Sequence, residues 1–483
     1  MKPNILWINC DQLRWDAVGY AGNNVIQTPN IDKLAKLGAC FENAYCASPV
    51  CSPARASWIS GQYPHSHHQY TNYRKEDIED GFLSESIVTL SKVLSNNGYT
   101  CGNIGVWHLG DDAKPQHGLT NPWITSSYLY GDNNDPFFSY LEKLGISNPY
   151  AIGAEGVFRY GKEFPLGVLS DARQQRTTWT IDKTLDFLKE KHQSPFFLMT
   201  GIKDPHPPMI PPVELLSLYT SEDLPFPENF HDPLRGKPAF QSQVRCRIEP
   251  GSIKIENFRT IIRYYYALVS HIDHEIGRII SFLEQNRMIN NTLLIFSSDH
   301  GEMLGNHGFL EKNLMYQESV KVPCTFSWPT QIPKQQKIST PFGGVDLAPT
   351  VLELVGIKIP NQMEGNSFAQ QLKTKKEGKI NPVFAEIASG QAFDYLSKGT
   401  NRANLELKEY AAHIMVINHN WKYVWNRFDI DELYNLETDP AEMLNLANYK
   451  LNQDRIVEMQ SLIVKMLENS GPGLYQWCLD YLN

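Results

Sequence analysis

The sequence predicts an α/β fold with one large, mostly parallel sheet flanked by helices, followed by a smaller C-terminal α+β subdomain. Two observations carry this prediction. Short apolar runs alternate with helical patterns along most of the chain, which is typical of buried parallel strands joined by helices. After a charged, lysine-rich stretch, the pattern changes to closely spaced β-type runs and one final helix, which favours a small antiparallel sheet.

Four apolar runs are the predicted strands of the large sheet. They are short and lack the alternation of a half-exposed strand, so we expect both faces of each strand to be buried. The second run, which contains a glycine and an asparagine, is the least apolar of them. The runs cover 5–8, 100–104, 196–199 and 293–296.

Helices are predicted between these strands. The first runs from Thr28 to Gly38, with Thr28 as N-cap, Pro29 at the first helical position and Gly38 at its end. A longer helix is predicted over 258–287, because its apolar residues recur with a period of 3.6. This alternation of strands and helices places helices on both faces of the sheet.

The charged segment 372–379 contains a glycine and is poorly amphipathic, which indicates a solvated linker. It divides the chain into a predicted catalytic domain, residues 1–372, and a predicted C-terminal subdomain, residues 380–483. The subdomain is expected to hold three strands and one helix. These elements are predicted at 383–386, 413–417 and 421–425, with the helix near 453–468.

Composition limits the classes of function. The 483 residues hold 44 Lys and Arg against 53 Asp and Glu, a formal charge of −9, so no nucleic-acid-binding surface is expected. A small anionic substrate stays possible, because a local pocket can be basic on an acidic protein. No apolar run reaches the roughly 18 residues of a membrane span, and no leader precedes the first strand. We therefore expect a cytoplasmic protein, or a periplasmic one if a leader has been removed.

Polar side chains follow each of the four predicted strands. In open α/β sheets, ligands bind outside the carboxyl ends of the strands, so these side chains are expected to form one shared site. They are Asp11 and Gln12 after the first strand, Trp107 and His108 after the second, Lys203, Asp204 and His206 after the third, and Asp299 and His300 after the fourth.

A cysteine precedes another predicted helix. Ser52 is expected to be its N-cap, Pro53 its first helical residue and Gly61 its end. Cys51 would then lie at a helix N-terminus, where free N–H groups favour an anion, and Arg55 could reach back toward it. Two interpretations stay open from the residues alone: an activated nucleophile, or a buried cysteine beside an ordinary capped helix.

The sequence resembles the type I sulfatase family of the alkaline phosphatase superfamily. Cys51-Ser52-Pro53-Ala54-Arg55 matches the family signature Cys-x-Pro-Ser/Ala-Arg, and further motifs match in order along nearly the whole chain. The resemblance implies an alkaline phosphatase-like fold. The other matching segments include Asp11-Gln12, Trp107-His108-Leu109-Gly110, Pro205-His206-Pro207-Pro208, Ser298-Asp299-His300-Gly301-Glu302, Lys312 and Glu432-Leu433-Tyr434.

The resemblance implies how a sulfate ester would be cleaved. In sulfatases a maturation enzyme oxidises the signature cysteine, here Cys51, to Cα-formylglycine, whose hydrate is a gem-diol. One hydroxyl attacks sulfur and expels the alcohol, and the second loses its proton so that sulfate leaves and the aldehyde returns. A serine sulfate ester would lack this exit. The implied reaction is hydrolysis of a sulfate monoester, and the implied substrates are sugar, aryl or alkyl sulfates.

The resemblance also assigns the supporting residues. Mostly oxygen ligands make Ca²⁺ the first choice of metal, while a histidine ligand keeps Mn²⁺ and Mg²⁺ open. The implied metal ligands are Asp11, Gln12, Asp299, His300 and the oxygen of residue 51. The implied catalytic residues are Cys51 as the nucleophile, Arg55 to hold the hydrate, His108 to take a proton from it, and His206 with Lys312 to contact sulfate and protonate the leaving oxygen.

One position departs from the family pattern. Val106 stands where the family usually has a lysine that contacts sulfate, so either another cation such as Lys203 replaces it or the pocket takes a different anion. The related phosphonate monoester and phosphodiester hydrolases also use formylglycine, carry Asp-Gln at the first metal position and lack this lysine, which makes them the alternative. A third possibility is a catalytically silent relative that only binds sulfated ligands.

Overall fold

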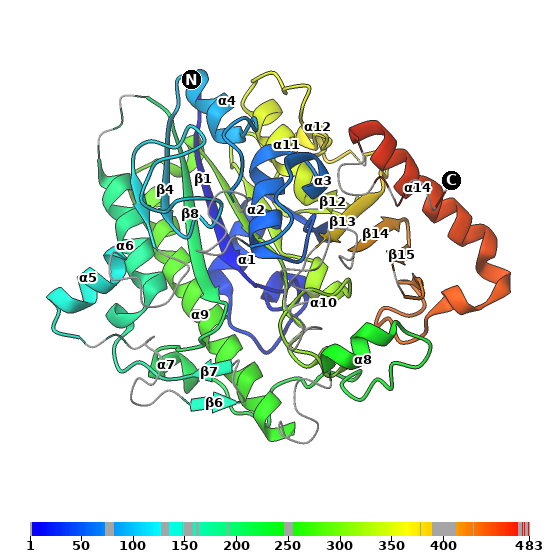
Figure 1. Ribbon diagram of the computed structural model, residues 1–483. Helices are drawn as coiled ribbons and strands as arrows, with labels where there is room; N and C mark the ends of the chain where they lie inside the picture. Colours follow the sequence, from blue (N-terminus) through cyan, green and yellow to red (C-terminus); the bar gives the residue numbers. More distant parts are fainter. Residues whose placement is uncertain are drawn as a thin grey trace.

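A computed structural model describes residues 2–72, 82–126, 135–146, 158–160, 164–190, 194–245, 255–376, 378–388, 412–427 and 429–471, with the single residues 148, 192, 476, 478 and 482. Within them, eight strands form one large sheet in the order β11-β2-β10-β9-β1-β8-β4-β5 (Figure 1). The strands are β1 (Asn4–Asp11), β2 (Ala39–Phe41), β4 (Thr100–Gly105), β5 (Trp123–Thr125), β8 (Phe196–Pro205), β9 (Thr292–Ser298), β10 (Cys324–Ser327) and β11 (Gln336–Ile338).

The four predicted strands are confirmed as β1, β4, β8 and β9. They are adjacent members of the sheet, and each pair of neighbours among them is parallel. Strand β10, by contrast, runs antiparallel to both of its neighbours, so the sheet is mostly but not wholly parallel. Because the four strands run in the same direction, their carboxyl ends meet at one edge of the sheet.

Helices cover both faces of the sheet (Figure 1). Successive side chains of a strand point to opposite faces, so the apolar strands pack against helices on both sides. Ile5 and Trp7 of β1 belong to one hydrophobic core, and Leu6 and Ile8 belong to the other. The first core includes side chains of α2 (Cys51–Ser60), α4 (Leu90–Asn96) and α11 (Leu347–Leu354), and the second includes those of α1 (Pro29–Leu37), α6 (Arg176–Lys189) and α9 (Ile255–Gln285).

Helix α1 lies where the sequence predicts it, but the expected side-chain cap is wrong. Thr28 is the N-cap residue, yet its side chain accepts a hydrogen bond from the N–H of Gly19 at 2.7 Å instead of capping the helix. The N–H groups of Asn30 and Ile31 donate to Asp273 Oδ1 of α9, at 2.8 and 2.7 Å. A carboxylate from another helix thus satisfies the free N–H groups of this terminus.

The C-terminal part contains four antiparallel strands among the described residues, one more than predicted: β13 (Val383–Ala388), β14 (Ala412–Asn418), β15 (Trp421–Asn426) and β16 (Glu432–Asn435). Helix α14 (Gln453–Ser470) packs on one face of this sheet through Met459 and Ile463. On the other face, Ala385 and Met415 belong to the first core of the large sheet.

The predicted linker is partly helical. Helix α12 (Ala369–Thr374) extends into its first residues, and Leu372 is fully buried in the first core, because its apolar side chain packs there despite the charged neighbours. Residues 374–376 and 379–380 are exposed, as expected of a linker. The predicted division at this segment stays a prediction.

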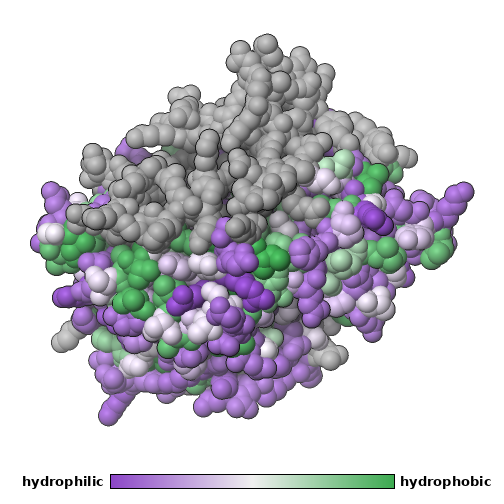
Figure 2. Space-filling model, turned by 90° about the horizontal axis from the view of Figure 1, so that it is seen from below, coloured by the Kyte–Doolittle hydropathy of each residue, from purple (hydrophilic) through white to green (hydrophobic). Residues whose placement is uncertain are grey.

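None of the helices that the structure describes combines the length and apolar character that a bilayer span requires. Figure 2 shows a face on which hydrophilic residues predominate over the described surface, with small apolar areas between them.

The remaining α-helices and strands are short. They are α3 (Pro64–His67), α5 (Pro136–Lys143), α7 (Val213–Leu216), α8 (Ala239–Arg245), α10 (Gln317–Val320), β3 (Ala44–Tyr45), β6 (Phe158–Tyr160), β7 (Phe164–Leu166) and β12 (Phe342–Gly343).

Candidate active site

Cys51 is the first residue of helix α2, which corrects the predicted start of this helix. Val50 is the N-cap, and its carbonyl already accepts the N–H of Ala54 at 3.0 Å, so the helix begins before the predicted cap, Ser52. Ser52 lies inside the helix, where its Oγ donates to the carbonyl of His108 at 2.8 Å. The predicted end is confirmed, because Gly61 adopts a φ of 68° and its N–H donates to Ser57.

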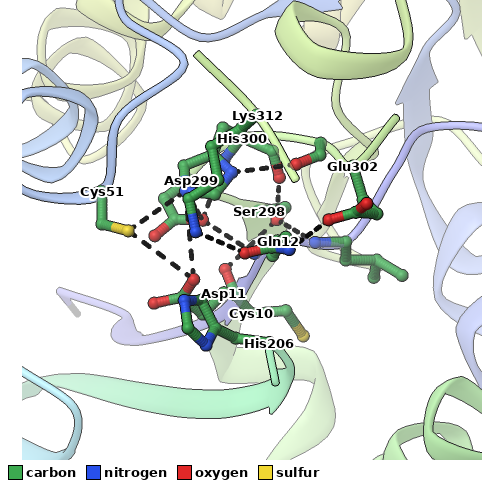
Figure 3. A network of polar contacts seen from close by, with 12 residues as sticks. Cys10, Asp11, Gln12, Cys51, His206, Ser298, Asp299, His300, Glu302 and Lys312 are labelled. Atoms are coloured by element: carbon green, nitrogen blue, oxygen red, sulfur yellow. Dashed lines mark hydrogen bonds and ion pairs between the residues drawn. The ribbon is translucent and has the colours of Figure 1, made fainter. Parts of the chain in front are cut away.

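The predicted strand-end residues meet around this cysteine (Figure 3). Cys51 Sγ lies 3.2 Å from His300 Nε2 and 3.9 Å from Asp11 Oδ1. One ligand atom from each of Asp11, Cys51, Asp299 and His300 lies within 4.8 Å of the others, and all four residues are buried. The shared site expected at the carboxyl edge of the sheet therefore exists, and this cluster could hold a metal ion.

Arg55 links the two carboxylates of this cluster. Its Nη2 donates to Asp11 Oδ2 and its Nε donates to Asp299 Oδ2, both at 3.0 Å, while Nη1 donates to the carbonyl of Val106 at 3.3 Å. Burial raises the pKa of Asp11 well above its ordinary value, and nearby Asp299 raises it further. For Asp299 burial acts in the same direction, but His300 and Arg55 outweigh it, so the pKa of this carboxyl is lowered.

Gln12 lies between Lys312 and Glu302 (Figure 3). Its backbone has a φ of 69°, and its N–H donates to Asp299 Oδ1 at 3.0 Å. The side-chain Oε1 accepts from Lys312 Nζ at 2.6 Å, and the side-chain Nε2 donates to Glu302 Oε2. Burial and neighbouring Glu311 raise the pKa of Glu302 to about 7, so this carboxyl is ionised at mildly alkaline pH.

Two histidines predicted to act on protons also face this site. His108 is buried, and burial together with the charges of Arg55 and Lys203 lowers its pKa well below the ordinary value. The pKa of His206 is lowered in the same way, by burial and by Lys312 and Lys203. His206 Nδ1 is 2.7 Å from the carbonyl of Pro207. The neutral ring therefore carries its proton on Nδ1 and has Nε2 as acceptor.

The position of the missing family lysine is apolar in the structure as well. Val106 is only 2% exposed, so its side chain packs in the core and offers no charge to the site. Lys203 comes from the adjacent strand β8 and is also buried. Burial and Arg176 lower the pKa of Lys203, while the charge of Asp11 acts in the opposite direction. Lys203 is thus a buried amine within electrostatic reach of His108 and His206, and its burial disfavours the charged form.

Hydrogen bonds and close contacts join Asp11, Gln12, Cys51, Arg55, Asp299, His300 and Lys312. Trp107 packs in the first core and Asp204 accepts a hydrogen bond from Thr177, so these two strand-end residues do not join the cluster. The structure adds Glu302 to the site. Sequence reasoning gave no role to this residue, although it ends the matching segment Ser298–Glu302. The signal that could have found it is its position two residues after His300, on a segment that continues to Lys312. The donors are chemically suited to a hard cation, because carboxylate and amide oxygens dominate and one imidazole joins them.

Comparison with known proteins identifies the family. The family model described as Sulfatase matches residues 3–357, and a second, N-sulphoglucosamine sulphohydrolase, C-terminal, matches residues 305–469. An arylsulfatase of Clostridium perfringens is 29% identical over 98% of this chain and 96% of its own length.

Two solved structures show the same fold. One is the structure of a protein in complex with its substrate, D-glucosamine-2-N,6-O-disulfate. This structure matches with a TM-score of 0.75 at 21% identity, and the match covers 99% of this chain and 100% of that chain. The other is a phosphonate monoester hydrolase of Agrobacterium radiobacter, with a TM-score of 0.80 at 20% identity, covering 97% of this chain and 96% of its own. Because the first family model spans well over half of the 483 residues, the chain belongs to the sulfatase family of enzymes.

Proposed function

We propose that the chain hydrolyses a sulfate monoester to the alcohol and inorganic sulfate, with residue 51 acting in its Cα-formylglycine form. The observation that carries this proposal is the place of Cys51 at the start of α2, where its Sγ faces His300 and Asp11 at 3.2 and 3.9 Å. The hydrated aldehyde supplies a nucleophilic oxygen and a second hydroxyl through which sulfate can later be released.

A divalent cation is the second part of the proposal. Asp11, Gln12, Asp299 and His300 would hold it together with the oxygen of residue 51, and Ca²⁺ is the first choice, with Mn²⁺ or Mg²⁺ as alternatives. Bound there, the cation neutralises charge on the sulfuryl oxygens. Arg55 already bridges the two carboxylates, and its charge favours the ionised form of each of them.

The histidines and lysines would then divide the proton transfers. His108, whose pKa is lowered, is neutral near pH 7 and can take a proton from residue 51. Although burial lowers the pKa of Lys312, Glu311 outweighs it and raises that pKa, so the ammonium stays charged. Lys312 and His206 would contact the sulfate, and Lys312, which stays charged, would protonate the leaving oxygen. Lys203 takes the place of the family lysine, at whose position this chain has Val106.

The substrate we propose is a small sulfated molecule, with a sulfated sugar as first choice and aryl or alkyl sulfates as alternatives. A neighbour of the same fold is bound to a disulfated glucosamine, which supports a sugar. The second partner is a formylglycine-generating enzyme that reads the segment from Cys51 to Arg55.

Rates on an aryl sulfate, a phosphonate monoester and a phosphodiester, measured side by side, test the reaction. We expect the sulfate ester to be the preferred substrate and Cys51→Ala to reduce its turnover to background while the unfolding midpoint is retained. Desulfation of a panel of sulfated sugars then tests the substrate class. Full activity in Cys51→Ala would refute the role of residue 51.

The alternative is a phosphonate monoester or phosphodiester hydrolase. Two observations favour it: Gln12 lies at the first metal position, and the buried Val106 leaves that part of the pocket without a lysine. A higher rate on the phosphonate than on the aryl sulfate would establish this alternative and overturn the first choice.

A further inference from the structure

Glu302 is a buried carboxylate to which the proposed reaction gives no part. Its Oε2 accepts from Gln12 Nε2, and its Oε1 accepts from the N–H of Leu304 at 3.1 Å and from the N–H of Glu311 at 2.6 Å. All three partners are donors, so the ionised form suits this site and a protonated carboxyl would aim its proton at an N–H group.

This contact decides which end of the Gln12 amide faces Lys312. A side-chain amide has a donating and an accepting end, and a carboxylate can receive only the donating one. Glu302 holds Nε2, and Oε1 therefore turns to the side of Lys312, whose Nζ donates to it at 2.6 Å. The backbone N–H of Gln12 donates to Asp299 Oδ1 at 3.0 Å, which places Gln12 next to the cluster that could hold a metal.

The same carboxylate also secures the loop that carries Lys312. Glu302 follows the cluster residue His300 by two positions, and its Oε1 binds the backbone of Glu311, the residue before Lys312. Lys312 Nζ in turn lies 3.0 Å from Glu311 Oε2. The carboxylate of Glu302, at one end of residues 302–312, thus binds both the side chain of Gln12 and the backbone of Glu311 near the other end.

We propose that Glu302 is a positioning residue that makes Gln12 an oxygen donor to the cation and seats Lys312 beside it. The inference rests on the proposed function, because it assumes that a cation binds at Asp11, Gln12, Asp299 and His300. The amide oxygen has two lone pairs, so it can accept from Lys312 and face a cation at the same time.

Exchanging the two side chains gives a direct test. In Glu302→Gln, two amides face each other, so Gln12 must turn its oxygen toward residue 302 and its NH₂ toward the cation. In Gln12→Glu, two buried carboxylates meet without a hydrogen between them. In the double variant Gln12→Glu/Glu302→Gln, the new amide at 302 donates to the new carboxylate at 12 and its oxygen keeps both backbone N–H groups. The net charge of the wild type is retained.

The measurement is the affinity for Ca²⁺ alone, by calorimetric titration at pH 8 into protein freed of metal by EDTA. Conversion of residue 51 is checked by mass in every preparation, and the unfolding midpoint in EDTA confirms folding. We expect Glu302→Gln to weaken Ca²⁺ binding roughly tenfold or more, as removal of a partner that orients a metal ligand does. The double variant should recover most of this loss and bind Ca²⁺ more tightly than Gln12→Glu alone. This comparison separates the orienting contact at residue 302 from the charge that the new carboxylate at residue 12 adds to the site.

Glu318→Gln is the matched control, because Glu318 is a buried carboxylate of the same region that binds Asn306 Nδ2 at 2.7 Å. The Glu318→Gln variant should bind Ca²⁺ with the affinity of the wild type. Wild-type affinity in Glu302→Gln, or a double variant no better than the single one, would overturn the inference. A wild type that binds no Ca²⁺, Mn²⁺ or Mg²⁺ would instead refute the proposed cation site itself.

Discussion

Asp11 and Asp299 are two fully buried carboxylates that come from neighbouring strands. Their mutual repulsion in a weakly polar interior is offset by Arg55, which pairs with both at 3.0 Å. Breaking a buried ion pair by removing one partner is costly, because the remaining charge keeps its desolvation cost without compensation. A bound cation would offset the same repulsion, so the role of Arg55 in stability depends on whether metal is present.

Arg55→Met should therefore lower the free energy of unfolding by about 3–5 kcal/mol in EDTA. The loss should be smaller with saturating Ca²⁺, because carboxylates that are no longer paired with Arg55 bind the cation more tightly, so the cation stabilises the variant more than the wild type. Urea unfolding in both conditions measures the difference. Arg173→Met, which removes the surface pair with Asp171, is the control and should leave the midpoint unchanged. An equal loss with and without Ca²⁺ would show that no cation binds between the carboxylates.

Most single residues of the site could be predicted because each follows a recognisable strand or signature. Cys51, Asp11, Asp299 and His300 do meet within one cluster. The use of Arg55 as a bridge between carboxylates could not be predicted, since it depends on how α2 crosses the strand ends. Glu302 was missed for the same reason: its partner Gln12 is 290 residues away in sequence.

At the scale of elements, the N-terminus of α1 is capped by a side chain from α9, a helix that is distant in the sequence. Asp273 of α9 accepts from two backbone N–H groups of α1 and from Asn30 Nδ2 at 2.9 Å. Burial nevertheless raises the pKa of Asp273 from 3.8 to about 6, because its desolvation outweighs these hydrogen bonds. The folded state thus binds a proton more tightly than the unfolded chain, and stability falls as the pH rises from about 4 to about 6.

Asp273→Asn should remove this pH dependence. Asparagine can keep the bonds to both backbone N–H groups, and Asn30 can turn its amide to accept from the new NH₂. Relative to the wild type, the variant should gain stability between pH 4 and pH 7 by up to about 3 kcal/mol, since one pKa unit is worth about 1.4 kcal/mol. Urea unfolding of both proteins across this range measures the gain. A difference that stays constant with pH would contradict the raised pKa.

Element prediction succeeded where burial leaves a simple pattern. Strands β1, β4, β8 and β9 lie in the middle of the sheet, so their sequences are short runs with few polar residues. The strands at 39–41, 324–327 and 336–338 were not predicted, because they are brief and contain polar residues such as Thr325 and Lys337. The predicted side-chain caps at Thr28 and Ser52 failed, because Asp273 of a distant helix accepts from the N-terminus of α1 and Ser52 Oγ donates to the distant carbonyl of His108.

At the scale of the whole molecule, the C-terminal sheet is part of the main core. Ala385 and Met415 are buried in the same cluster as Trp58 of α2. His65, which follows α2, lies 2.5 Å from Glu386 Oε1 of β13 and 2.6 Å from Ser470 Oγ of α14. The helix that carries Cys51 is therefore supported by the C-terminal strands and helix.

A fragment of residues 1–379 should not fold cooperatively, because it would expose the apolar surface that the C-terminal sheet covers. We expect weak near-UV circular dichroism and no sharp unfolding transition, in contrast to the full chain. A cooperative transition of the fragment would show that residues 1–372 form an independent domain.

The proposed reaction requires residue 51 to be formylglycine in the active enzyme. The mass of the tryptic peptide Leu37–Arg55, from protein produced together with a formylglycine-generating enzyme and active on a sulfate ester, tests this most directly. We predict a peptide in which an aldehyde replaces the CH₂SH of Cys51, in a fraction that rises in step with the activity. An unmodified cysteine in fully active protein would contradict the account.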